Sequence, residues 1–293
     1  MKTNTDKYLV KPGKKVKLKD FDTSYDGHLD KETGKEELQN VKEQLSIHQE
    51  SLYASNTYSL LVIFQAMDAA GKDSAIAHVM SGLNPQGCQV YSFKTPNSEE
   101  YEHDFLWRHY KALPERGRIG IHNRSHYENV LVCKVHPNYV LNENIPHYDD
   151  VEKIDKKFWA ERYESIRNFE KHIVANGTKV IKIFLNVSKD EQKQRFLDRI
   201  EEPSKNWKFS AGDLKERALW DKYMSAYEEA IQETATADAP WFIIPADKKW
   251  YARLAISQII DEALQDMKLK FPELPPEEVA ELGTLRQQLL DEV

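Results

Sequence analysis

The feature that most constrains the fold lies between residues 61 and 80, where an apolar segment leads through a small-residue loop into a helical pattern. Leu-Val-Ile at 61–63 predicts a buried strand. The loop that follows ends in Gly71-Lys72, and the residues after it predict a helix. This order is typical of a phosphate-binding P-loop, in which backbone N–H groups and the helix N-terminus bind phosphate oxygens. The alternative is a glycine turn with an exposed lysine.

Two positions depart from the usual P-loop pattern. Ala66 stands where the first glycine is expected, and Asp73 stands where a Ser or Thr normally contacts Mg²⁺. An additional acid, Asp68, lies inside the loop. Lys72 would reach the phosphates as a compact point charge. Together with Glu128, which follows the third expected strand, the two loop acids suggest a metal site built from carboxylates.

Strand and helix patterns alternate along the chain, which predicts an α/β fold with a parallel sheet of about five strands and helices on both faces. The expected strands are 60–65, 88–93, 118–122, 180–185 and 241–245. The expected helices are 35–54, 98–112, 155–175, 190–202 and 248–267. We expect one P-loop kinase domain over 1–293, with an N-terminal arm and helix in 1–55, a lid at about 189–222 and a charged helical tail at about 275–293. The tail would serve packing or oligomer contact.

Charge and apolar content exclude several classes of protein. A net charge of −7 argues against general binding of nucleic acid or membrane surfaces. Neither a signal peptide nor a membrane-spanning run is evident, so a cytoplasmic location is expected. Cys88 and Cys133 lie in apolar runs and are expected to be buried free thiols. His48 lies on the apolar stripe of its helix and is expected to pack there.

A polar cluster at 123–129 follows the third strand, Asn-Arg-Ser-His-Tyr-Glu-Asn. Ligands of an open parallel sheet bind beyond the carboxyl ends of its strands, so this cluster should face the P-loop. Arg124 can grip phosphate oxygens in a bidentate manner. Glu128 is a hard oxygen ligand that suits Mg²⁺ together with Asp68. A polar loop with a local salt bridge is the alternative.

The segment after the fourth strand is rich in arginine. Arg195 and Arg199 lie one turn apart on the helix 190–202, and Trp-Lys-Phe follows at 207–209. A helical hairpin at this place in a P-loop fold is typical of a lid that closes over phosphates and excludes water. A solvated helix pair is the alternative.

These parts indicate phosphoryl transfer, in which the protein aligns two anions and neutralises their repulsion. The predicted catalytic residues are Asp68, Lys72, Arg124 and Glu128. The predicted phosphate- and nucleotide-binding residues are Ala69, Ala70, Gly71, Lys72, Asp73, Ser74, Asn123 and Arg124. Arg195, Arg199 and Lys208 are the predicted lid residues that neutralise phosphate charge, and Asp68 and Glu128 are the predicted metal ligands.

The motifs at 66–73, 123–128 and 206–209 resemble those of the polyphosphate kinase 2 family. The Ser-His-Tyr-Glu sequence at 125–128 is most similar to the class III branch of that family. By analogy with the family, Arg195, Arg199 and Lys208 would be polyphosphate-binding residues of the lid. The resemblance, which extends from about residue 8 to about residue 270, implies transfer of phosphate from inorganic polyphosphate to AMP and ADP, in both directions. It also implies Mg²⁺, or Mn²⁺ in its place, and a homodimer or homotetramer. ATP and guanine nucleotides would be further nucleotide partners. The family usually has Phe at the position of His122, and many members have Asp at that of Asn129.

Two other functions are compatible with the sequence. An ATP-dependent nucleoside or nucleotide kinase of the thymidylate-kinase type would need an adenine pocket at the donor end. A non-catalytic polyphosphate-binding protein would bind the chain without turnover.

Overall fold

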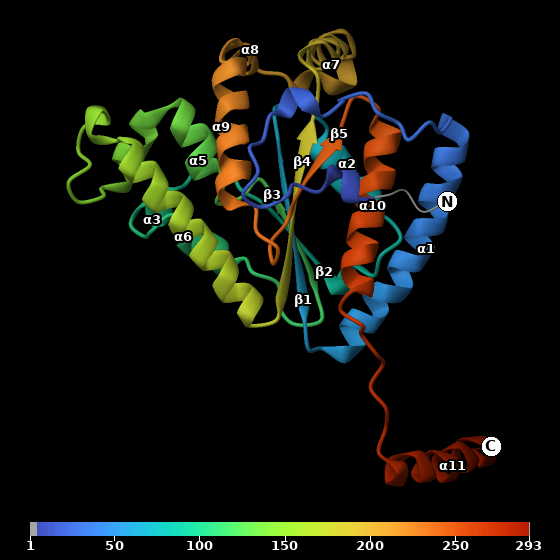
Figure 1. The fold of residues 1–293 in the computed structure, drawn as a ribbon. Coiled ribbons are helices and arrows are strands. Elements are labelled where there is room, and N and C mark those ends of the chain that lie inside the picture. The colour runs from blue at the N-terminus through green and yellow to red at the C-terminus, as the bar shows by residue number, and fades with distance from the viewer. Residues whose placement is uncertain (1–4, 293) are drawn as a thin grey trace.

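The computed structural model describes residues 5–292, whose centre is a five-stranded parallel sheet (Figure 1). Its strand order is β2-β3-β1-β4-β5. The strands are β1 Ser59–Ala66, β2 Cys88–Ser92, β3 Ile119–Asn123, β4 Thr178–Asn186 and β5 Trp241–Pro245. β1 pairs with β3 on one side and β4 on the other, and all of its residues are buried. The predicted parallel α/β sheet is confirmed.

Helices cover both faces of the sheet, as predicted (Figure 1). One layer holds α1 Lys31–Ser55, α2 Lys72–Val79 and α10 Lys249–Gln265, and the other holds α5 Glu128–Val135, α6 Lys156–Ala175 and α9 Trp220–Thr234. Two of these helices begin at aspartate caps. Asp30 accepts from the N–H groups of Glu32 and Thr33, and Asp155 accepts from that of Phe158. Buried apolar side chains from both layers and the sheet form one continuous cluster.

The N-terminal arm lies on β5, as expected for a segment that covers the core. Leu9 forms an antiparallel bridge to Phe242, and Val10 N donates to Trp241 O at 2.9 Å. Residues 1–4 of the predicted arm lie outside the described residues. His48 lies at the α1–α10 contact with Nδ1 2.6 Å from Asp261 Oδ1, so it also links the two helices through a polar contact.

The single helix predicted at 98–112 is wrong. Two short helices occupy this region, α3 Ser98–Tyr101 and α4 Trp107–Lys111. Asp104 causes the break, because its side chain accepts from Leu106 N at 2.9 Å and its carbonyl accepts from Trp107 N at 3.0 Å. Aspartate competes in this way with continuous helical hydrogen bonding.

The predicted lid consists of α7 Lys189–Glu201, the short 3₁₀-helix η6 Pro203–Lys208 and α8 Ala211–Ala218. These elements lie beyond the carboxyl ends of the strands, whereas α9, which begins at Trp220, belongs to a helical layer (Figure 1).

The tail helix α11 Pro276–Asp291 extends away from the rest of the chain, and its described residues are exposed (Figure 1). The tail therefore does not pack on the other described residues, and its alternative role in oligomer contact stays a prediction. Both cysteines are free as predicted, although Cys88 is only partly buried. None of the described helices has the length and hydrophobicity needed to cross a membrane.

Candidate active site

The loop between β1 and α2 has the backbone conformation of a phosphate-binding loop. Ala69 and Gly71 have φ values of 58° and 104°, which turn the chain sharply before the first helical residue. Gly71 is needed for its backbone conformation, because a φ of 104° is unfavourable for a residue with a side chain. Lack of space is not the reason, since the nearest atom to an added Cβ, Arg195 Nη1, would lie at an ordinary van der Waals distance of 3.7 Å. The loop opens onto a crevice of about 490 Å³, lined also by residues 92–95, Asn123 and Arg124.

Lys72 lies at the bottom of this crevice, in the first turn of α2. Its Nζ donates to Ala66 O at 2.7 Å, and only 9% of the residue is exposed. Burial lowers the pKa of the Lys72 ammonium to about 8, and the positive charge of Arg124 acts in the same direction. A bound phosphate group would favour the charged form.

Arg124 brings the predicted catalytic acids together. Its Nη2 donates to Asp68 Oδ1 at 3.0 Å, and its Nη1 lies 3.5 Å from Glu128 Oε2. The two carboxylates, Glu128 more strongly than Asp68, raise the pKa of the Arg124 guanidinium. The loops after β1 and β3 therefore meet as the sequence predicted.

The residues around Arg124 fit a magnesium ion. Asp68 and Glu128 offer hard oxygen ligands from two loops, and Asp68 lines the crevice. Among the described residues, no group of three or more His, Cys, Asp or Glu side chains is arranged to hold a metal. Mg²⁺ commonly uses only one or two carboxylates, together with substrate phosphates and water.

The remaining predicted loop residues are divided between the crevice and its support. Asn123 Nδ2 donates to Asp73 Oδ1 at 2.7 Å, which links the ends of β3 and α2. Ser74 Oγ accepts from Arg253 Nη2 at 2.7 Å. Asp73 and Ser74 both line the crevice.

Arg195 does not lie where the sequence prediction placed it. The residue is 4% exposed, and its guanidinium is directed into the protein. Nη1 donates to the carbonyls of Ala69 and Ala70, Nη2 to those of Ala246 and Asp247, and Nε to Glu191. All five N–H groups are thus engaged. This arginine stabilises the P-loop from behind, which corrects the expectation that it binds polyphosphate.

The other two lid cations remain near the surface. Arg199 Nη1 donates to Lys208 O at 3.1 Å and lies 3.8 Å from Asp213 Oδ2. The Lys208 side chain is exposed beside Trp207. Gln192 Nε2 donates to Asp68 O at 2.8 Å, so α7 is attached to the P-loop.

A second hollow of about 260 Å³ adjoins the first and shares Lys94 and Arg124 with it. Its wall combines Phe93, Val132 and Tyr139 with polar groups that include Arg108. Sequence reasoning missed Lys94 and Arg108. Lys94 follows β2, and the rule that ligands bind at the carboxyl ends of strands could have identified it.

The two departures from the family pattern both have contacts within the protein, and Asn129 also lines the second hollow. His122 is buried, contacts Phe93 edge-on and has its Nε2 3.0 Å from Ala112 O. Burial lowers its pKa to about 4. Asn129 Nδ2 donates to His126 O at 3.2 Å, an arrangement that accounts for the side chain without a metal.

Comparison with known proteins identifies the family. The profile of polyphosphate kinase 2 matches residues 28–272. An ADP-polyphosphate phosphotransferase of Rhodopseudomonas palustris is 53% identical and covers 99% of this chain and 100% of its own. An AMP/ADP-polyphosphate phosphotransferase of Meiothermus ruber is 41% identical, and the alignment covers 94% of this chain and 97% of the relative.

A solved structure gives the same result. The crystal structure of polyphosphate kinase 2 from Arthrobacter aurescens superimposes with a TM-score of 0.88 at 38% identity, covering 98% of both chains. Because profile, full-length relatives and fold agree, the chain belongs to the polyphosphate kinase 2 family.

Proposed function

We propose that this protein transfers phosphate from inorganic polyphosphate to AMP and ADP, reversibly and with Mg²⁺. One observation carries the proposal: Arg124 lies between Asp68 and Glu128 at a P-loop crevice, in a chain of this family. The relatives named above are described as phosphotransferases that use polyphosphate with ADP or with AMP and ADP. Activity on both acceptors would place the protein in the class III branch.

The chemistry needs little from the protein beyond alignment and charge. The terminal phosphate of an acceptor nucleotide is already ionised, so its oxygen attacks phosphorus without a general base. A new P–O bond to the nucleotide forms as the bond to the polyphosphate oxygen breaks. Loop N–H groups, Lys72 and Arg124 would hold the transferred group and stabilise its charge. Asp68 and Glu128 would hold Mg²⁺, which supplies further charge neutralisation.

The two hollows suggest how the substrates are arranged. The second hollow combines apolar and aromatic side chains with several polar groups, a lining that can hold both the base and the sugar hydroxyls of a nucleoside, and Glu128 is among its residues. The polyphosphate chain would then approach along the lid, where Arg199 and Lys208 provide positive charge near the surface. We further propose a cytoplasmic homodimer or homotetramer, which light scattering of the purified protein would test.

The experiment is incubation with AMP, Mg²⁺ and polyphosphate in the absence of ATP. ADP and then ATP should form, and a chelator should abolish both products. Product formed only when ATP is the donor would instead favour the thymidylate-kinase type. Binding of polyphosphate without any product would favour the non-catalytic protein.

A further inference from the structure

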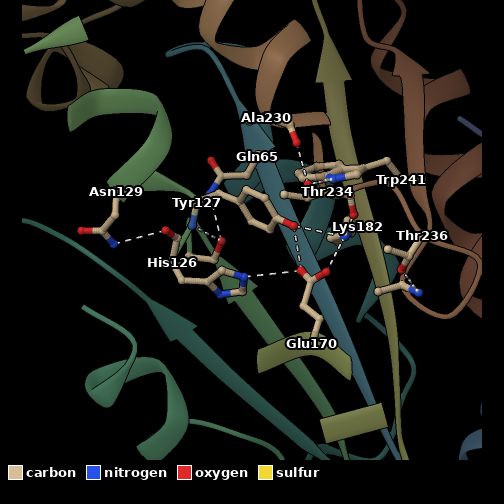
Figure 2. A network of polar contacts seen from close by, with 12 residues as sticks. Gln65, His126, Tyr127, Asn129, Glu170, Lys182, Ala230, Thr234, Thr236 and Trp241 are labelled. Atoms are coloured by element: carbon tan, nitrogen blue, oxygen red, sulfur yellow. Dashed lines mark hydrogen bonds and ion pairs between the residues drawn. The ribbon is translucent and has the colours of Figure 1, made fainter. Parts of the chain in front are cut away.

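A buried ion pair, Glu170 with Lys182, lies beside His126 and Tyr127, which follow Arg124 in the chain (Figure 2). Lys182, in the middle of β4, has its Nζ 2.6 Å from Oε2 of Glu170 on α6. The same Nζ donates to Thr234 O at 2.8 Å and to Tyr127 Oη at 3.1 Å. Tyr127 Oη in turn donates to Glu170 Oε1 at 2.7 Å. The two charged side chains and the tyrosine are at most 1% exposed.

This arrangement is not explained by packing. Removing two charges from water is unfavourable, and apolar residues of similar volume often replace such a pair with equal or greater stability. The surrounding positions of the sheet are apolar: Ile63 on β1 and Trp241 on β5 flank Lys182 in register. The pair therefore holds its neighbouring side chains in one defined arrangement, which an apolar core would not do.

The ion pair fixes the position of the Tyr127 side chain. Each of the three ammonium donors of Lys182 has its own acceptor, so a displaced tyrosine would leave buried polar groups unpaired. The ring is also fixed edge-on against Trp241 at 4.8 Å, whose Nε1 donates to Thr234 Oγ1 at 2.9 Å. His126 adds a further contact, with Nε2 3.5 Å from Glu170 Oε1 (Figure 2).

The loop above needs such support. Arg124 has φ = 63°, a left-handed conformation that is unfavourable for a residue with a side chain. Ser125 Oγ accepts from Tyr127 N at 3.2 Å, so the backbone of the tyrosine is joined to the loop. From the side, Gln65 can donate to Glu128 Oε1 at 2.9 Å while its amide oxygen accepts from Ser125 N and Oγ. The catalytic acid and arginine thus lie on either side of an anchored segment.

We propose that Glu170, Lys182 and Tyr127 form a positioning unit, which sets Arg124 and Glu128 opposite Asp68 for metal binding and phosphoryl transfer. The inference rests on the proposed function for its kinetic readout. None of the three residues lines the crevice or the adjoining hollow, so they act through the loop rather than on the substrate.

The main test is Tyr127→Phe, which removes one hydroxyl and keeps the ring on Trp241. Loss of a partner that orients metal ligands typically costs about tenfold to a hundredfold in metal affinity or activity. We expect such a fall in kcat, with the KM for polyphosphate changed less than about twofold, because the P-loop and lid are untouched. Tyr8→Phe is the matched control. It removes a buried hydroxyl 2.6 Å from Tyr251 Oη, away from the crevice, and should leave kcat unchanged.

A second readout requires no turnover. Titration of Mn²⁺ with AMP present and polyphosphate absent, followed by electron paramagnetic resonance, should show weaker binding in Tyr127→Phe than in Tyr8→Phe. If the wild type binds Mn²⁺ but is inactive with polyphosphate, the proposed function fails, and the Mn²⁺ affinities of Tyr127→Phe and Tyr8→Phe alone decide for or against the positioning unit. If the wild type is active and Tyr127→Phe matches it in kcat and Mn²⁺ affinity, the positioning unit fails.

An apolar replacement separates positioning from stability. Lys182→Met alone leaves the buried Glu170 carboxylate without its counter-ion, so it should lower the Tm strongly. The triple variant Tyr127→Phe, Glu170→Leu, Lys182→Met should recover much of that Tm but keep the low kcat. Recovery of kcat together with the Tm would overturn the proposal, because the pair would then contribute stability only.

Discussion

Arg195 provides a sharp test of how the P-loop is held. Sequence reasoning placed it on the polyphosphate, whereas the structure places it behind the loop with its donors on four carbonyl groups and Glu191. Replacing Arg195 with Met keeps much of the side-chain volume but removes every donor. The resulting change in stability should be large.

The magnitude follows from the acceptors that lose their donor. Ala69, Ala70 and Ala246 are at most 8% exposed, so water cannot readily replace the guanidinium at their carbonyls. A buried polar group that loses its partner costs about 1 to 3 kcal/mol, and about 1 to 2 kcal/mol for each neutral carbonyl gives about 3 to 6 kcal/mol for the three. Asp247 and Glu191 are more exposed and should contribute less. For a protein of this size the loss corresponds to a fall in Tm of roughly 6 to 12 °C.

The assay is thermal unfolding followed by steady-state kinetics well below the Tm. Arg195→Lys should be intermediate, because a compact ammonium has three donors and cannot reproduce the planar fork. Arg199→Met, one helical turn away, is the matched control. Arg199 donates to Lys208 O, and its ion pair with Asp213 is long at 3.8 Å, so its loss should cost about 1 kcal/mol or less.

The kinetics distinguish the two roles. Arg195→Lys should lower kcat because the loop that holds the transferred phosphate loosens, whereas Arg199→Met should chiefly raise the KM for polyphosphate. A wild-type Tm for Arg195→Lys combined with a large rise in that KM would refute the reasoning. Arg195 would then be a substrate ligand after all.

Three further predictions follow from the site and the tail. Asp68→Asn should abolish turnover while polyphosphate binding, measured by calorimetry, persists; equal loss of both would contradict its metal role. Because the pKa of Lys72 is lowered to about 8, its neutral form increases above that pH, while a bound phosphate favours the charged form. Polyphosphate affinity should therefore fall above about pH 8. Binding there should take up a proton, which calorimetry in buffers of different ionisation enthalpy would detect. Lys72→Arg should shift the fall in affinity to higher pH, and an unchanged pH profile would argue against the assignment. Truncation after Pro272 should leave Tm and kcat unchanged, because α11 has no buried residue. A lower Tm of the truncated protein at matched concentration would indicate that the helix packs in solution.

Local patterns predicted much of the fold because they depend on neighbouring residues. The apolar run of β1, the Gly71-Lys72 turn and the spacing of the helices each follow from the chain itself. The topology rule for parallel sheets then brought Asp68, Arg124 and Glu128 to one edge, as observed. The failure at 98–112 came from one side chain, since Asp104 competes with the helix for backbone N–H groups.

Tertiary structure decided what the same patterns left open. Spacing along α7 placed Arg195 and Arg199 on one side of a helix but could not show that only one of them points into the protein. Burial depends on what packs against the helix, and here the P-loop and the end of β5 meet Arg195. In the same way, nothing local indicates that Lys182, inside an apolar strand, meets Glu170 of α6 and a tyrosine of the catalytic loop. Local motifs and strand order were therefore enough to predict the reaction class and the edge of the sheet that carries it. Which cations face substrate and which support the loops was decided by long-range packing, which alone sets the burial of each charge.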